Sequence, residues 1–173
     1  MTRTLLVLRH GEAANSSQDF DRPLTARGTK QAHFIGAHLR QHEIIPDIIL
    51  HSSVPRVLQT MKSLIDGLQF GPVHQESCGL SFYQAASIED LHILAQTLIP
   101  SSARTALMIG HNPWIYEYAG FLAETNTTPA GQKLLSGYPP ATLSIFKYSG
   151  GEWSDIHPDQ CELQDVVLAE GLS

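Results

Sequence analysis

The sequence is poor in cysteine and has no long apolar run. Cys78 and Cys161 are its only cysteines, and two cysteines without CxxC spacing do not form a disulfide framework. A reducing, cytoplasmic compartment is therefore expected. The apolar run that follows Thr4 ends at the charge of Arg9, which makes it too short for a signal sequence or a membrane span. No membrane association is expected.

Basic residues are also few. Eleven Lys and Arg stand against 17 Asp and Glu, and the formal net charge is −6. This balance disfavours nucleic acid as a partner, because a phosphate backbone requires a basic surface. A small pocket can still be basic, since nearby charges set the local field. The length of 173 residues, with 42% hydrophobic and 16% charged residues, predicts one globular domain over residues 1–173.

What the sequence does contain is a series of short apolar runs that alternate with amphipathic segments. Strands are predicted over residues 5–8, 47–50, 73–76, 105–109 and 141–148. Helices are predicted over residues 26–42, 54–68, 87–98 and 113–122. Apolar strands that alternate with helices indicate an α/β domain with a largely parallel sheet.

Polar side chains follow three of the predicted strands directly. Arg9 and His10 follow the strand predicted over residues 5–8, and His51 follows the one over residues 47–50. His111 and Asn112 follow the strand over residues 105–109. Ligands of such sheets bind at the carboxyl ends of the strands. We therefore expect these residues to lie near one another.

Two arginines and two histidines in this arrangement suit the transfer of a phosphoryl group. The planar forks of Arg9 and Arg56 can each hold two phosphate oxygens. His10 can attack phosphorus when one ring nitrogen is unprotonated, and neighbouring guanidinium groups disfavour its imidazolium form. His111 can donate to the transferring oxygens if it is protonated.

Four segments, in order, resemble the signature of the histidine phosphatase superfamily, also called phosphoglycerate mutase-like. They are LRHGE at residues 8–12, RPLTARG at 22–28, SSVPRVLQT at 52–60 and IGHNP at 109–113. Within the superfamily, the short chain and the close spacing of the first two segments are most similar to the SixA-type phosphohistidine phosphatases.

The resemblance implies a phosphoglycerate mutase-like fold, a three-layer α/β/α sandwich around a mostly parallel central sheet. It implies that His10 is the phosphorylated nucleophile and that Arg9, Arg56 and His111 complete the catalytic pocket. No metal or organic cofactor is implied. The substrate would be a phosphorylated protein carrying phosphohistidine or a small phosphorylated molecule, and inorganic phosphate the product. A monomer is expected, because the sequence has no coiled-coil heptads.

Four further residues are candidates for substrate binding. Gly11, Arg22 and Asn112 belong to the matched segments or border them. Many relatives carry an asparagine six residues after the nucleophile, where this chain has Ser16 preceded by Asn15. Either side chain could serve, or the segment is a loop without contact to phosphate.

The proton donor to the leaving group is unassigned. Glu76 and Glu89 are candidates, but they are interpreted as surface positions of a strand and of a helix start. Tyr83 could line the pocket, although a phenol with a reference pKa of about 10 is a poor acid at neutral pH. A phosphoramidate such as phosphohistidine needs a proton donor less than an alkyl phosphate does, so an activated phosphate is the favoured substrate.

Two other functions remain open: a non-catalytic module that binds phosphorylated ligands, and a mutase-type phosphotransferase. A metal site is considered at His38 and His42, whose spacing of four residues can bring both onto one helix face. No HExxH pattern or third ligand accompanies them, so they are interpreted as solvated helix positions.

Overall fold

The structure is a computed structural model that describes residues 2–71, 73–123 and 127–169. The described residues form a six-stranded sheet with the strand order β3-β2-β4-β1-β5-β6. The strands are β1 (Arg3–Arg9), β2 (Ile48–His51), β3 (His74–Ser77), β4 (Thr105–Gly110), β5 (Thr142–Tyr148) and β6 (Cys161–Leu168). The pairs from β3 to β1 are parallel, while β5 is antiparallel to both of its neighbours. The predicted mostly parallel sheet is confirmed.

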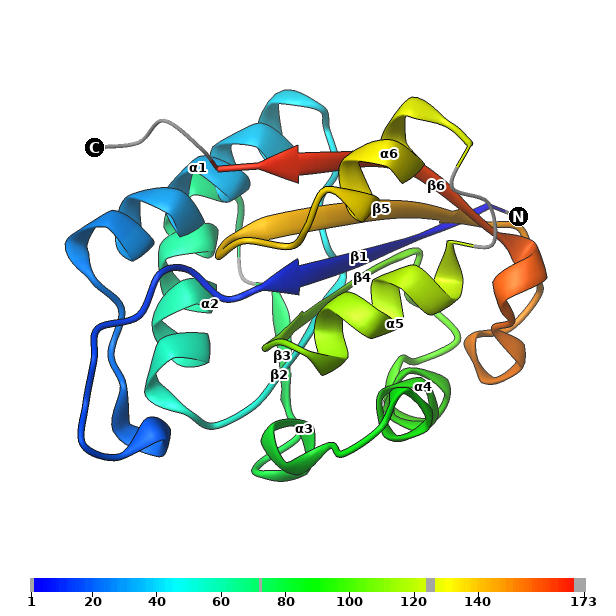
Figure 1. The fold of residues 1–173 in the computed structure, drawn as a ribbon. Helices are drawn as coiled ribbons and strands as arrows, with labels where there is room; N and C mark the ends of the chain where they lie inside the picture. Colours follow the sequence, from blue (N-terminus) through cyan, green and yellow to red (C-terminus); the bar gives the residue numbers. More distant parts are fainter. Residues whose placement is uncertain (1, 72, 124–126, 170–173) are drawn as a thin grey trace.

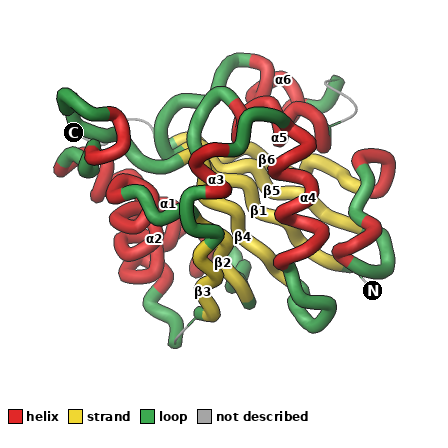
Figure 2. Tube along the Cα trace, turned by 90° about the horizontal axis from the view of Figure 1, so that it is seen from below, coloured by secondary structure: helices red, strands yellow, loops and turns green. Residues whose placement is uncertain are grey.

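Helices cover both faces of this sheet, which confirms the three-layer sandwich. They are α1 (Ala26–Gln41), α2 (Pro55–Leu68), α3 (Ser81–Gln84), α4 (Ile88–Leu98), α5 (Trp114–Leu122) and α6 (Pro129–Leu135). Figures 1 and 2 show α1 and α2 on one face and α4 and α5 on the other. Among the described helices, none combines the length and the apolar character that a membrane span requires.

The first strand is central because its apolar residues face both layers. Leu5 and Val7 belong to the core under α4 and α5, whereas Leu6 and Leu8 belong to the core under α1 and α2. All four are fully buried, as a continuous apolar run in a parallel sheet requires. The polar residues that follow β1 are thereby fixed at the carboxyl edge of the sheet.

Helices α1 and α2 are in backbone contact. A Cβ atom on Gly36 would lie 2.0 Å from the carbonyl oxygen of Leu64, and one on Gly67 would lie 2.1 Å from that of His33. Glycine at these two positions lets the helices approach closely. The tight pair holds the first turn of α2, which carries Arg56, against the segment that follows β1.

Three elements are not predicted from the sequence: α3, α6 and β6. The first five residues of β6 alternate between half-buried and exposed positions, and the register of β6 with β5 shifts between Ile145 and Phe146. An edge strand of this kind has little apolar periodicity. The short helices α3 and α6 likewise give too few turns for a pattern.

Candidate functional site

The carboxyl ends of β1 and β4 open into a cavity of about 230 Å³. Its described lining brings together all four residues predicted to be catalytic, which come from β1, the segment after it, α2 and the segment after β4. The lining residues are Arg9, His10, Glu12, Ala13, Asp19, Arg22, Arg56, His111, Asn112 and Pro140.

His10 is held in one orientation at the base of this cavity. Its side chain is 6% exposed, and Nδ1 lies 2.7 Å from the carbonyl oxygen of Gly11. A carbonyl only accepts, so Nδ1 carries the proton and donates it. Nε2 is therefore the unprotonated nitrogen, which is the form that a nucleophilic imidazole needs.

Burial and nearby cations keep His10 neutral. Burial is the main reason that the pKa of His10 falls to about 3, and the charges of Arg56 and Arg9 lower it further, against the opposing hydrogen bond to Gly11. Burial followed by the charge of Arg56 also lowers the pKa of His111 below its usual value. Both imidazoles are thus biased toward the neutral form at neutral pH.

This depressed pKa predicts a specific loss of stability in acid. His10 has a lower pKa in the folded chain than in the unfolded chain, so the unfolded state binds the extra proton between about pH 6.5 and pH 3. The free energy of unfolding should fall as the pH drops through this window, by at most about 1.4 kcal/mol per pH unit from this group. His10→Asn should show a shallower fall.

The measurement is denaturant unfolding of both proteins at pH 7.0, 5.5 and 4.5. Asparagine retains an amide donor for the Gly11 carbonyl, so the difference between the two pH profiles isolates the buried ionisable ring. The histidines outside the cavity should contribute equally to both profiles. Parallel profiles would contradict the lowered pKa of His10.

Arg9 is oriented by a residue that lies far along the chain. Its Nη1 donates to the carbonyl oxygen of Tyr138 at 2.8 Å, and Nδ2 of Asn112 donates to the same oxygen at 3.1 Å. The phenol of Tyr138 is buried and donates to the carbonyl oxygen of Val7 at 2.7 Å. Tyr138 therefore anchors both polar side chains to β1, although nothing in the sequence pattern marks it.

Arg56 is almost wholly buried and is paired with Asp19. Nη1 of Arg56 donates to the carbonyl oxygen of Asp19 at 2.6 Å, and Nη2 donates to Oδ2 of Asp19 at 3.0 Å. Oδ2 also accepts from the phenol of Tyr83 at 3.0 Å. Tyr83 packs its ring beside Arg56, at 5.5 Å from Cζ, and beside His111, at 5.2 Å between ring centroids. Asp19 carries no signal in the sequence pattern that marks it as a site residue.

The threonine and glutamine of the third matched segment fix loops rather than substrate. The hydroxyl of Thr60 donates to the carbonyl oxygen of Arg56 at 2.7 Å and accepts from the backbone N–H of Gly11 at 3.0 Å. The side-chain oxygen of Gln59 accepts from the backbone N–H of Leu24 at 2.6 Å. The segment therefore couples α2 to the loops on either side of the cavity.

The second matched segment has a structural role as well. Thr25 caps α1, with its hydroxyl accepting from the backbone N–H of Gly28 at 2.9 Å. A Cβ atom on Gly28 would lie 2.1 Å from the carbonyl oxygen of Glu12, and one on Gly11 would lie 2.5 Å from the carbonyl oxygen of Gly28. The segment after β1 is thus packed directly on the first turn of α1.

Two of the four predicted substrate-binding residues line the cavity. Arg22 and Asn112 line the cavity, whereas Gly11 and Asn15 are not among its lining residues. The N–H of Gly11 is bonded to Thr60. Asn15 is exposed.

Neither acid proposed as a proton donor lines the cavity. Glu76 lies 3.6 Å from the ring of His74 on β3, and Glu89 is exposed in the first turn of α4. The carboxylates of the described lining are instead Glu12 and Asp19. Oε1 of Glu12 accepts from the hydroxyl of Thr25 at 2.8 Å.

Four residues that line the cavity each have a buried polar atom that lacks a hydrogen-bond partner within the described residues. These atoms are Nε of Arg9, Nε of Arg56, Nδ1 of His111 and Oδ1 of Asn112. Buried polar groups are normally satisfied, so a cluster of exceptions requires an explanation. Two guanidinium donors and an imidazole nitrogen around one small cavity can be satisfied together by an oxyanion.

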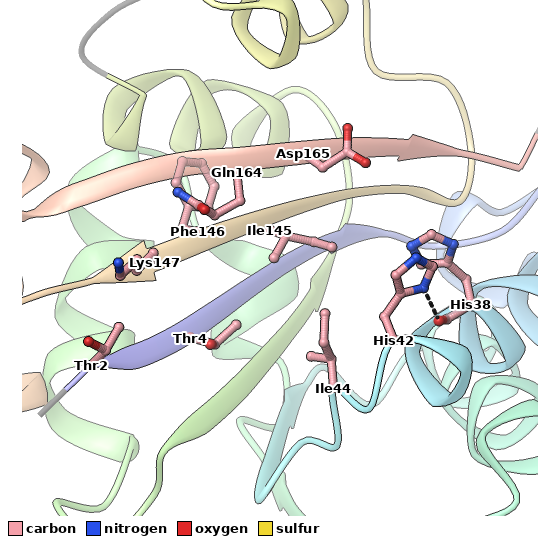
Figure 3. Close-up of a pocket in the computed structure, with 10 residues that line it drawn as sticks. All are labelled: Thr2, Thr4, His38, His42, Ile44, Ile145, Phe146, Lys147, Gln164 and Asp165. Carbon is pink, nitrogen blue, oxygen red and sulfur yellow. Dashed lines mark hydrogen bonds between the residues drawn. The ribbon is translucent and has the colours of Figure 1, made fainter.

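A second cavity, of about 380 Å³, lies beside the end of α1 and over β1, β5 and β6. Figure 3 shows the rings of His38 and His42 at one end of it. The two rings stack at 4.1 Å between centroids, and His38 is half-buried rather than solvated. No group of three or more potential metal ligands occurs in the part of the chain that the structure describes.

The histidine phosphatase superfamily (branch 1) has a sequence profile that matches residues 5–78. The matched range includes His10 and Arg56. An uncharacterized protein of Mycobacterium tuberculosis is 27% identical to this chain over 158 residues, which cover 87% of this chain and 92% of that protein.

Solved structures share the fold over nearly the whole chain. A SixA protein of Nakamurella multipartitia has a TM-score of 0.82 at 24% identity, covering 97% of this chain and 96% of that one. The protein histidine phosphatase SixA, solved with tungstate, has a TM-score of 0.76 at 18% identity, covering 98% and 99%. The chain has the phosphoglycerate mutase-like fold of these structures, and its residues 5–78 are similar to the histidine phosphatase superfamily.

Proposed function

We propose that this protein is a phosphatase that hydrolyses phosphohistidine, or another activated phosphate, through a covalent phosphohistidine on His10. One observation carries the proposal. The neutral imidazole of His10 lines a small cavity together with Arg9 and Arg56, whose buried Nε atoms have no partner among the described residues. A phosphoryl group bound to these donors would lie next to a ready nucleophile.

The reaction would proceed in two displacements. In the first, Nε2 of His10 attacks phosphorus, and the bond from phosphorus to the leaving group breaks with its electron pair on the leaving atom. Arg9 and Arg56 would stabilise the charge on the transferring oxygens, which is the main contribution of a protein to such a step. In the second, water attacks phosphorus, the His10–phosphorus bond breaks, and inorganic phosphate leaves.

His111 would complete the binding of the phosphoryl group. Its Nδ1 is buried without a partner among the described residues, whereas Nδ2 of Asn112 already donates to the carbonyl oxygen of Tyr138. A proton shared between the phosphoryl group and His111 would satisfy that nitrogen. Tungstate is an oxyanion, and its presence in the SixA structure of the same fold supports an oxyanion in this cavity.

The carboxylates favour an activated phosphate over an alkyl phosphate. Asp19 is a poor proton donor, because its hydrogen bonds, first of all that from Arg22, lower its pKa to about 2. Glu12 is engaged by Thr25 and by Arg27. The leaving group of phosphohistidine is an imidazole, which departs as a neutral ring when its other nitrogen carries a proton, so it needs little help from an acid of the protein.

The test is to trap the phosphorylated protein. The chain is mixed with a phosphohistidine peptide, quenched within milliseconds in alkali, and analysed by peptide mass spectrometry. We expect an acid-labile phosphoryl group on His10 and steady release of inorganic phosphate. Stoichiometric binding of the peptide without release of phosphate would favour the non-catalytic binding module instead.

A further inference from the structure

Asp19 is the charged residue of the cavity whose role the proposed reaction leaves open. It lies in a short 3-10 turn, η1 (Asp19–Asp21), and its side chain is 57% exposed although it lines the cavity. Donors from three parts of the chain converge on its carboxylate: Arg22, Arg56 and Tyr83. Three hydrogen-bond donors therefore fix the position of this loop carboxylate at the edge of the cavity.

The charges of the lining leave no cation for a second anionic group. If Arg9 and Arg56 bind the phosphoryl oxygens, the remaining arginine of the lining is Arg22, whose Nη1 is 3.1 Å from Oδ1 of Asp19. Glu12 adds another carboxylate to the lining. A substrate with a carboxylate close to its phosphate would therefore meet negative charge on the protein.

The carboxylate of Asp19 also has capacity for one more donor. A carboxylate offers about four lone-pair sites, and three are occupied by Arg22, Arg56 and Tyr83. The strong hydrogen bonds keep it ionised, since they lower its pKa to about 2. An N–H group on the leaving side of the substrate could use the fourth site.

We propose that Asp19 is a specificity-determining residue that favours phosphorylated imidazoles and disfavours phosphate esters carrying a neighbouring carboxylate. This inference rests on the proposed function. In phosphohistidine, the ring nitrogen that does not carry phosphorus can hold a proton. Through this N–H group the ring can donate a hydrogen bond to Asp19. When Nε2 of His10 attacks, the phosphorus–nitrogen bond breaks with its electron pair on the substrate nitrogen. The ring, which keeps its proton, then leaves as neutral imidazole and is still hydrogen-bonded to Asp19.

The first test compares two substrates in three proteins. The value of kcat/KM is measured for a phosphohistidine peptide and for 3-phosphoglycerate with the wild type, Asp19→Asn and Asp21→Asn. Asp21 is the matched control, since it lies in the same turn and its carboxylate has no hydrogen bond or ion pair among the described residues. Asp19→Asn should lower the ratio of the two values by about tenfold or more, and Asp21→Asn should change it by less than about twofold. An unchanged ratio in Asp19→Asn would overturn the proposal.

A binding measurement separates this inference from the proposed function. Calorimetry with methylphosphonate and with phosphonoacetate, neither of which is hydrolysed, reports the penalty for an added carboxylate. The wild type should bind phosphonoacetate more weakly, and Asp19→Asn should narrow the difference by about threefold or more. If the protein hydrolysed neither substrate, the proposed function would be refuted. The binding of the two phosphonates would still test the role of Asp19. If the affinities for methylphosphonate and phosphonoacetate differed by the same factor in the wild type and in Asp19→Asn, the role of Asp19 would be refuted, even in an active phosphatase.

Discussion

His10→Ala should lower kcat/KM for a phosphohistidine peptide by about 10³-fold or more, because it removes the atom proposed to form the bond to phosphorus. The substitution should also abolish the phosphoryl label on the protein. The side chain lines the cavity, and its one hydrogen bond among the described residues is to the carbonyl oxygen of Gly11. The fold should therefore survive its removal.

The control is His157→Ala, which removes an exposed imidazole paired with Asp159. Its turnover should remain within about twofold of the wild type. Circular dichroism of both variants checks the fold. His10→Ala with wild-type turnover would refute the covalent mechanism, whatever the substrate.

The second large effect is expected for Arg56→Lys, which should lower kcat by about 10²-fold. The guanidinium of Arg56 already donates to two oxygens of Asp19, and its buried Nε–H has no partner among the described residues. An ammonium group is a point charge and cannot reproduce that fork. Because the charge is preserved, a large loss would show that geometry matters more than charge.

Stopped-flow measurement of phosphoryl transfer, with inorganic phosphate binding by calorimetry, resolves whether binding or transfer is lost. Arg104→Lys is the control for the same change at an exposed position and should leave both values unchanged within about twofold. If Arg56→Lys transferred phosphoryl groups at the wild-type rate, Arg56 would not contact the transferring group. Denaturant unfolding of the variant excludes loss of folding as the cause.

The arrangement of the site was predictable where short-range rules apply. The four apolar residues before Arg9 predict β1, and the carboxyl end of such a strand is where ligands bind. The same rule brings His111 to this edge, phosphate chemistry indicated Arg56, and all of them line one cavity. Their catalytic roles, the cytoplasmic location and the monomeric state stay predictions.

Two residues of the site were out of reach of such rules. Asp19 meets Arg56 across 37 positions of sequence, and Tyr138 meets Arg9 across 129. Each contact depends on where a loop lies after the sheet has assembled. The hydrophobic periodicity of a sequence does not predict the position of a loop. A loop aspartate and a tyrosine before a proline look ordinary in the sequence.

The hydroxyl of Thr60 has a consequence for how the site responds to motion. It accepts from the backbone N–H of Gly11, next to His10, at 3.0 Å and donates to the backbone carbonyl of Arg56 at 2.7 Å. A displacement of α2 should therefore carry the segment after β1 with it. We expect the distance between His10 and Arg56 to change less than the positions of the surrounding helices do.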